Sequence, residues 1–117
     1  MSSDGTVRQI FTLVEAQQLL PRIRTMTEEA ATAADHLSVN IQQMAEVDPS
    51  RVAMTVELEG LVVAWATRAQ ELGLEVKGLW LVDFDNGEGY YCWKYPEVAI
   101  LHYHGYDEGF EGRMKIL

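Results

Sequence analysis

The first part of the chain carries apolar residues at every third or fourth position, which is the spacing of a helix with one buried face. Thr12 and Glu15 can form a capping box at the start of this helix. The apolar positions are Ala16, Leu19, Leu20, Ile23, Met26, Ala30, Ala33, Ala34, Leu37, Ile41 and Met44. Pro21 predicts a kink, because proline lacks an amide hydrogen and its ring crowds the preceding turn. The pattern predicts a helix over about residues 12–46.

A second helical pattern follows the break "EVDPS" at residues 46–50. Asp48 can cap a helix whose first position is Pro49, where proline is well tolerated. Apolar residues then recur at helical spacing as far as Gly73, which is suited to end a helix. We therefore predict a helix over about residues 49–72. Its middle, "LVVAWA" (61–66), is apolar nearly all round and should be covered on more than one side.

After Gly73 the pattern changes to that of β-strands. Branched and aromatic residues dominate about residues 75–84, 89–95 and 98–104. Asn86-Gly87 is a strong hairpin signal, and Pro96 suits the second position of another turn. The expected fold is α+β, a long antiparallel helical hairpin followed by a three-stranded antiparallel β-meander. We expect a flexible arm over residues 1–10 and a single domain over residues 11–117.

Charge and composition restrict the possible partners. The formal net charge is −9 and the pI is about 4.6, whereas nucleic-acid binding normally needs a basic surface. The single Cys92 cannot form an internal disulfide and is typical of a reducing compartment. The first residues lack the features of a signal peptide, and "LVVAWA" is far shorter than the roughly 20 apolar residues that span a bilayer. We expect a cytoplasmic protein that binds neither nucleic acid nor membranes.

The length of the first helix predicts a homodimer. An unbroken helix over residues 12–46 would be about 52 Å long at about 1.5 Å per residue. A compact domain of this size has a radius of gyration of about 13 Å, so such a helix would extend beyond it. Packing of two helical hairpins into a four-helix bundle would cover the overhang and the apolar belt around Trp65. The alternative is a monomer whose first helix is broken at Pro21 and near Asp35.

Tight turns at both hairpins would determine which strand side chains share a face. We centre the turns on Asn86-Gly87 and Pro96-Glu97. One face then carries Leu79, Leu81, Asp83, Tyr90 and Cys92. The other carries Trp80, Val82, Phe84, Tyr91 and Trp93, and this richer aromatic set is the expected core face. His102 and His104 fall on the core face, opposite to Asp83 and Cys92.

This arrangement argues against a metal site. Cys92 and His104, with or without Asp83, could ligate one ion only if a bulge or a different loop length turned one strand over. His102 and His104 have the spacing of two ligands on one strand, but no CxxC or HExxH motif adds further ligands. We therefore expect no metal and no other cofactor. If an ion binds, the ligands would be His102 and His104, or Cys92. Otherwise His104 should hydrogen-bond to a carbonyl or carboxylate, and Cys92 should be a buried, inert thiol.

The tail "GYDEGFEGRMKIL" (105–117) is the most distinctive segment. Its glycines permit tight turns that would let Phe110 enter the core and bring Arg113 back beneath it. The guanidinium of Arg113 could then hold a carboxylate of Asp83 or Asp107, or that of an anionic ligand. Asp83, His104 and Arg113 are accordingly the candidate ligand-binding residues.

Four segments carry a resemblance to a known family. They are "FTLVEAQQLLP", "GLEVKGLWLVDF", "YYCW" and "HGYDEGFEGR". They closely resemble the bacterial family named domain of unknown function 2203, and the likeness covers about residues 10–115. The resemblance singles out Asp83, Cys92, His104 and Arg113 but implies no activity, because none is established for the family. This chain differs from the family pattern at Asp85, where proline is usual, and at Tyr103 and His102, where tryptophan and an aromatic residue are usual.

Two functions follow from these features. The leading one is a homodimeric interaction or binding module without catalysis. The alternative is a small-ligand- or metal-dependent enzyme with a polar site around His104, Arg113 and Asp83. A pocket on which these side chains converge would favour the enzyme, whereas salt-bridged or solvent-facing side chains would favour the module.

Overall fold

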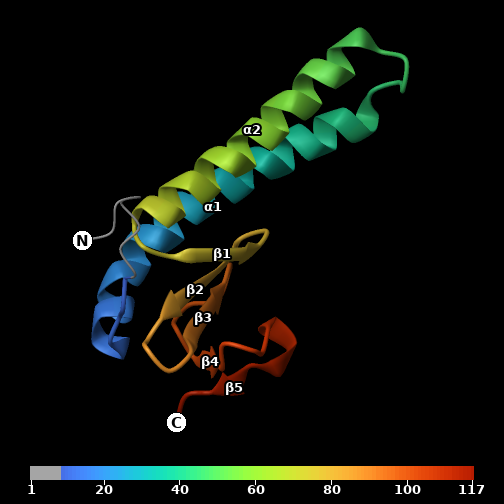
Figure 1. The fold of residues 1–117 in the computed structure, drawn as a ribbon. Helices are drawn as coiled ribbons and strands as arrows, with labels where there is room; N and C mark the ends of the chain where they lie inside the picture. Colours follow the sequence, from blue (N-terminus) through green and yellow to red (C-terminus); the bar gives the residue numbers. More distant parts are fainter. Residues whose placement is uncertain (1–8) are drawn as a thin grey trace, which may run out of the picture.

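A computed structural model describes residues 9–117, so most of the arm predicted at residues 1–10 lies outside the described part of the chain. Two antiparallel helices come first and a sheet follows (Figure 1). The helices are α1 (Leu13–Gln43) and α2 (Pro49–Glu71). The strands are β1 (Glu75–Gly78), β2 (Leu81–Asp85), β3 (Tyr90–Lys94), β4 (His102–His104) and β5 (Met114–Lys115), with a short 3-10 helix η1 (Phe110–Gly112) before β5. The five strands form one antiparallel sheet in chain order, and the fold is α+β as expected.

Helix α1 is continuous over 31 residues. The capping box is present, with Thr12 Oγ1 accepting from the amide of Glu15 at 3.1 Å and Glu15 Oε1 accepting from the amide of Thr12 at 2.8 Å. Pro21 lies inside the helix and is exposed. The break at Pro21 and near Asp35, which we expected for a monomer, is therefore wrong. An exposed proline costs less than a buried one, because water can bond to the carbonyl that it leaves without an amide partner.

The core lies where the helices meet the sheet. Val82, Phe84 and Trp93 of the expected core face are completely buried, and they pack with Ile23 of α1. Trp65 of α2 is only 3% exposed within a single chain. Its indole N–H donates to Thr27 Oγ1 of α1 at 2.8 Å, and its ring packs edge-on against Trp80, with ring centroids 4.9 Å apart. Trp65 therefore belongs to the core of one chain.

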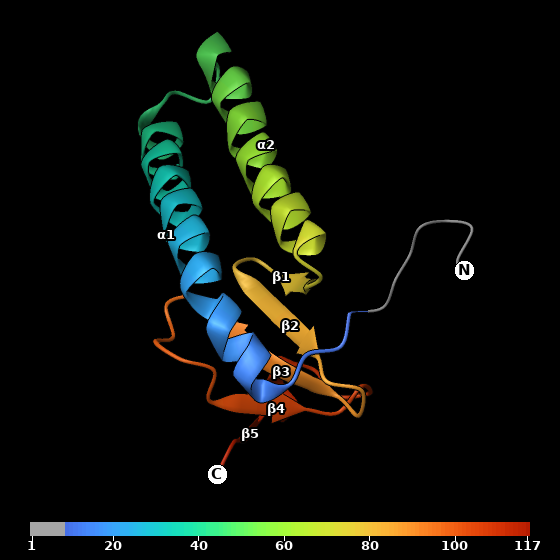
Figure 2. The ribbon, with the colours of Figure 1, turned by 90° about the vertical axis from the view of Figure 1, so that its left-hand side faces the viewer.

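The far half of the helical hairpin extends beyond the sheet (Figures 1 and 2). The described chain measures 50 × 38 × 26 Å and has a radius of gyration of 16.6 Å. Within one chain "LVVAWA" is covered on one side only, since Val63 on the same segment is 62% exposed. Neither described helix is long and apolar enough to cross a membrane.

The strands differ from the predicted meander in number and length. The segment predicted as one strand over residues 75–84 contains two, β1 and β2, joined by a turn at Leu79 and Trp80. Trp80 has a φ of 57°, a conformation that large side chains rarely adopt, so a turn at this residue is not expected from the sequence. The segment predicted at 98–104 is a strand only from His102 onward. Strand β5 was not predicted. The sheet thus has five strands instead of three.

The first hairpin has a longer loop than predicted. Asp83 pairs with Cys92 and not with Tyr90. The loop is closed by Asn86, whose amide donates to the carbonyl of Gly89 at 2.9 Å and whose side-chain oxygen accepts from the amide of Gly89 at 2.8 Å. The register differs by two residues from the predicted one. Because side chains alternate with a period of two, Asp83 and Cys92 still share a face.

The second hairpin overturns the predicted placement of the histidines. Cys92 pairs with His102, and Tyr90 pairs with His104. A tight turn at Pro96-Glu97 would have paired Tyr91 with His102, so the true register differs by one residue. The long connection over residues 95–101 causes this difference. A shift of one residue turns every side chain of a strand to the other face. His102 and His104 therefore lie on the face of Asp83 and Cys92.

Candidate metal centre

Three neighbouring strands bring together an acid, a thiol and an imidazole. Asp83 comes from β2, Cys92 from β3 and His104 from β4. All three side chains are buried, and Asp83 is only 1% exposed. One donor atom of each lies within 4.8 Å of the other two. Among the described residues, no other group of His, Cys, Asp and Glu has this geometry.

The hydrogen bonding of His104 leaves one ring nitrogen facing Asp83. Its Nδ1 lies 2.9 Å from the carbonyl oxygen of Gly105. A carbonyl can only accept, so Nδ1 must carry a proton. In a neutral imidazole Nε2 then presents a lone pair, and this atom lies 2.9 Å from Asp83 Oδ2. Two acceptors at this distance repel each other unless a proton or a metal ion lies between them.

The carboxylate of Asp83 lacks the partners that a buried charge needs. Although Oδ2 is close to His104, the contact lacks hydrogen-bond geometry, and neither oxygen has a hydrogen bond among the described residues. Burial raises the pKa of Asp83 above its usual value, while His104 and Cys92 oppose that rise. A buried carboxylate is strongly destabilising when its only close neighbour is a neutral acceptor. The arrangement therefore favours a bound cation.

Cys92 is not an activated nucleophile in this environment. Burial, and after it the nearby charge of Asp83, raise the pKa of its thiol to about 12. This pKa already includes the opposing effect of the Arg113 guanidinium, whose Nη1 lies 3.9 Å from Sγ. The free thiol is therefore protonated near neutral pH, and nucleophilic catalysis needs the thiolate. A coordinated metal ion would displace this proton.

A cavity of about 360 Å³ leads to the three side chains. Its other lining residues are Lys77, Leu81, Tyr90, Tyr106, Asp107, Glu108, Gly109 and Phe110. Tyr106 donates a hydrogen bond to Asp85 at 2.7 Å, and Tyr90 donates one to Glu75 at 3.0 Å. Lys77 lies over the ring of Tyr90, at 4.7 Å from its centroid. The cavity thus combines a buried donor set with a partly aromatic, partly charged wall.

One family model matches nearly the whole chain. It is DUF2203, described as an uncharacterized conserved protein, and the match covers residues 9–116. The chain belongs to this family. The resemblance predicted from the sequence motifs is therefore confirmed. No curated protein and no solved structure matches the chain. The description of DUF2203 states no activity.

Arg113 of this DUF2203 chain does not contact either of the acids that we expected. Its Nη1 pairs with Glu97 Oε2 at 2.9 Å, and its guanidinium lies over the Phe110 ring at 4.1 Å from the centroid. Phe110 is 38% exposed and lies outside the core, which also corrects the prediction. The short helix η1 keeps this turn at the surface, where Glu97 of the preceding loop can reach Arg113. Arg113 is thus held by an internal ion pair next to Cys92.

His102 shares a strand face with His104 but lies outside the donor cluster. Its Nδ1 is 3.8 Å from Glu97 Oε2, which places it beside the Arg113–Glu97 pair. The structure therefore does not bring the two histidines together as ligands of one ion. Two residues of the cavity wall were not among the predicted site residues. Tyr90 was placed on the strand face of Asp83 and Cys92, because it lies two residues before Cys92, but no motif singles it out. Tyr106 lies in a loop, and no local pattern indicates its long-range bond to Asp85.

Proposed function

We propose that the chain binds one divalent transition-metal ion of the zinc class through Asp83, Cys92 and His104. The observation that carries this proposal is the close approach of two buried acceptors, Asp83 Oδ2 and His104 Nε2, at 2.9 Å. Carboxylate, thiolate and imidazole are all ligands that zinc takes in proteins. Asp83 and a deprotonated Cys92 together supply two negative charges, which match the charge of the ion.

The surroundings of His104 support the same proposal. Histidines that bind metals usually donate their second ring N–H to a carboxylate, a carbonyl or water, which orients the ring. The Nδ1 contact with the Gly105 carbonyl, at 2.9 Å, is of this kind. Three protein ligands are one fewer than the four that zinc commonly takes, and catalytic zinc sites leave that position for water or substrate. The cavity beside the cluster has room for such a ligand.

We infer that the site serves metal-dependent binding or conversion of a small ligand. A bound ion of this class would polarise a carbonyl or lower the pKa of coordinated water. The aromatic wall of Tyr90, Tyr106 and Phe110 would exclude bulk water around the ligand, and Lys77 would contact its polar part. The register of β4 puts His104 on the same face as Asp83 and Cys92. For this reason we prefer this function to an interaction module without catalysis. Homodimerisation in the cytoplasm remains a separate proposal.

Elemental analysis of untagged protein tests the metal proposal. The wild type should carry about one equivalent of zinc or a related ion per chain after extensive dialysis without chelator. Cys92→Ser and His104→Gln should each reduce the bound metal by at least about tenfold, because each removes one of three ligands. His102→Gln is the matched control, since this histidine lies on the same strand and face but outside the cluster. It should retain the metal.

Two results would contradict the proposal. One is a wild-type chain that carries no metal as purified and takes up none when zinc is added. The other is metal that binds equally well to the wild type and to Cys92→Ser. In either case a proton would be the cation between Asp83 and His104.

A further inference from the structure

The far half of the helical hairpin has no core of its own. From Asp35 to Ala64 no residue is buried, although both helices are apolar on one side there. The half-buried apolar residues of this stretch are Leu37, Ile41, Met44, Met54, Leu58, Leu61 and Val62. Two helices alone cannot enclose such residues, and helical stability in proteins comes mostly from tertiary packing of the apolar face. The far half therefore needs a further layer.

Helix α2 also presents an exposed apolar row. Val52, Val56 and Val63 are each more than 60% exposed, at 69%, 61% and 62%. They are separated by four and seven residues, so they lie on one face of the helix. At about 3.6 residues per turn this row points away from Leu61 and Trp65, so it lies on the side of α2 that faces away from α1.

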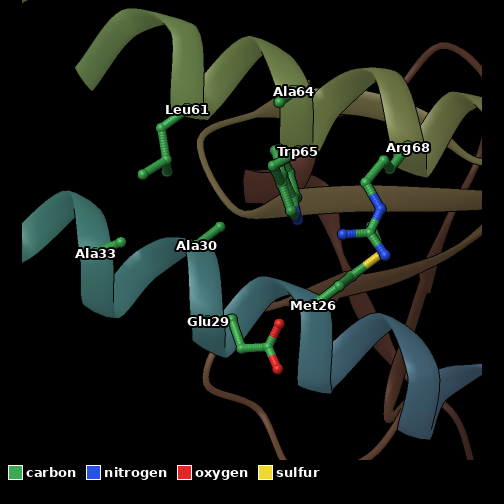
Figure 3. Close-up of a pocket in the computed structure, with 8 residues that line it drawn as sticks. All are labelled: Met26, Glu29, Ala30, Ala33, Leu61, Ala64, Trp65 and Arg68. Carbon is green, nitrogen blue, oxygen red and sulfur yellow. The ribbon is translucent and has the colours of Figure 1, made fainter. Parts of the chain in front are cut away.

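A groove of about 250 Å³ runs between the two helices (Figure 3). Its walls are Met26, Glu29, Ala30 and Ala33 of α1, and Leu61, Ala64, Trp65 and Arg68 of α2. The alanines leave space, and the distance between packed helices depends on the side chains at the contact. Glu29 and Arg68 lie on opposite walls near Met26. No ion pair joins these two charged residues among the described contacts.

We infer that a second copy of this chain packs on this face and completes a four-helix bundle. A two-fold axis parallel to the hairpin places α1 of one copy over α2 of the other at the same height. Glu29 then faces Arg68 of the partner subunit, and the same contact occurs a second time by symmetry. The groove carries one acid and one base on opposite walls, which is the pattern of a self-complementary surface. Its residues lie on the helices, so the inference is independent of the metal proposal.

A charge-swap experiment tests this interface. The wild type should have twice the 13.2 kDa mass of one chain in light scattering. Glu29→Arg and Arg68→Glu should each raise the dissociation constant by about a hundredfold, because each creates two like-charge contacts. An equimolar mixture of the two variants should form dimers again, since both contacts in the mixed dimer join opposite charges. Both residues are exposed, so neither substitution disturbs the core of one chain.

The mixture distinguishes an interface from an effect within one chain. If the charges interacted only within a chain, mixing two altered chains would restore nothing, and that result would overturn the inference. A wild type that stays monomeric at high micromolar concentration would also overturn it, whatever else binds the groove. If the single variants do not fold alone, they are denatured and refolded together. Recovery of a folded mixed dimer then supports the interface, and failure to recover it contradicts the interface.

Discussion

Asp83→Asn should change stability in opposite directions with and without metal. In the presence of a strong chelator, the variant should be more stable than the wild type by about 1–3 kcal/mol, the usual penalty of an unsatisfied buried polar group. The reason is that the carboxylate of Asp83 has no hydrogen bond among the described residues, and its Oδ2 lies 2.9 Å from Nε2 of His104, which is a second acceptor while the imidazole is neutral. An asparagine amide could donate to that nitrogen.

With zinc in excess the order should reverse. A ligand that binds only the folded state adds about 4 kcal/mol to the free energy of unfolding when its concentration is a thousand times its dissociation constant. The wild type should gain this stability, while Asp83→Asn should gain little. Urea denaturation in chelator and in zinc measures both differences. Asp107→Asn is the matched control, since Asp107 lines the same cavity but is exposed, and its effect should be small in both conditions. A variant that is less stable than the wild type in both conditions would contradict the expected reversal.

Trp65→Ala should lower the free energy of unfolding by about 3–5 kcal/mol, as is usual for the truncation of a buried aromatic residue. Trp65 joins three parts of the fold. Its backbone belongs to α2, its N–H bonds to Thr27 of α1, and its ring packs on Trp80 in the turn between β1 and β2. The substitution removes the aromatic contact and leaves the buried hydroxyl of Thr27 without this donor.

Chemical denaturation of the variant at a fixed protein concentration measures this loss. Val63→Ala is the control, because Val63 lies two residues earlier on α2 and is 62% exposed. Its effect should stay within about 0.5 kcal/mol, the range of ordinary surface substitutions. A loss below about 1 kcal/mol for Trp65→Ala would mean that this tryptophan does not hold the helices to the sheet.

The helices and the core could be predicted because their signals are local and repeated. The capping box at Thr12 and the three-and-four spacing that follows it determine α1, and the aromatic alternation in β2 and β3 identifies Phe84 and Trp93 as core. Many positions contribute to each pattern, so one irregular residue such as Pro21 does not change the outcome. The fold class follows from these elements alone.

The candidate site could not be predicted in the same way, because its geometry depends on one loop. A tight turn at Pro96-Glu97 and the longer connection observed there differ by one residue in the pairing of β4. That difference decides whether His104 faces Trp93 or Cys92. The sequence indicates the length of a loop only weakly. A difference of one residue in pairing nevertheless turns every side chain of the next strand to the other face of the sheet. The family motifs single out Asp83, Cys92 and His104, but they do not show that the three side chains meet.

Titration of the metal-free protein with cobalt(II) is the most direct test of the metal site. Cobalt(II) occupies zinc sites and reports its ligands by absorption, since thiolate ligation gives a charge-transfer band in the near ultraviolet and tetrahedral geometry gives intense visible bands. The wild type should develop both sets of bands, with saturation at about one equivalent per chain, and zinc should abolish them. Cys92→Ser should lose the charge-transfer band. If the wild type shows only the weak spectrum of aqueous cobalt(II) at every ratio, then Asp83, Cys92 and His104 do not form a metal site.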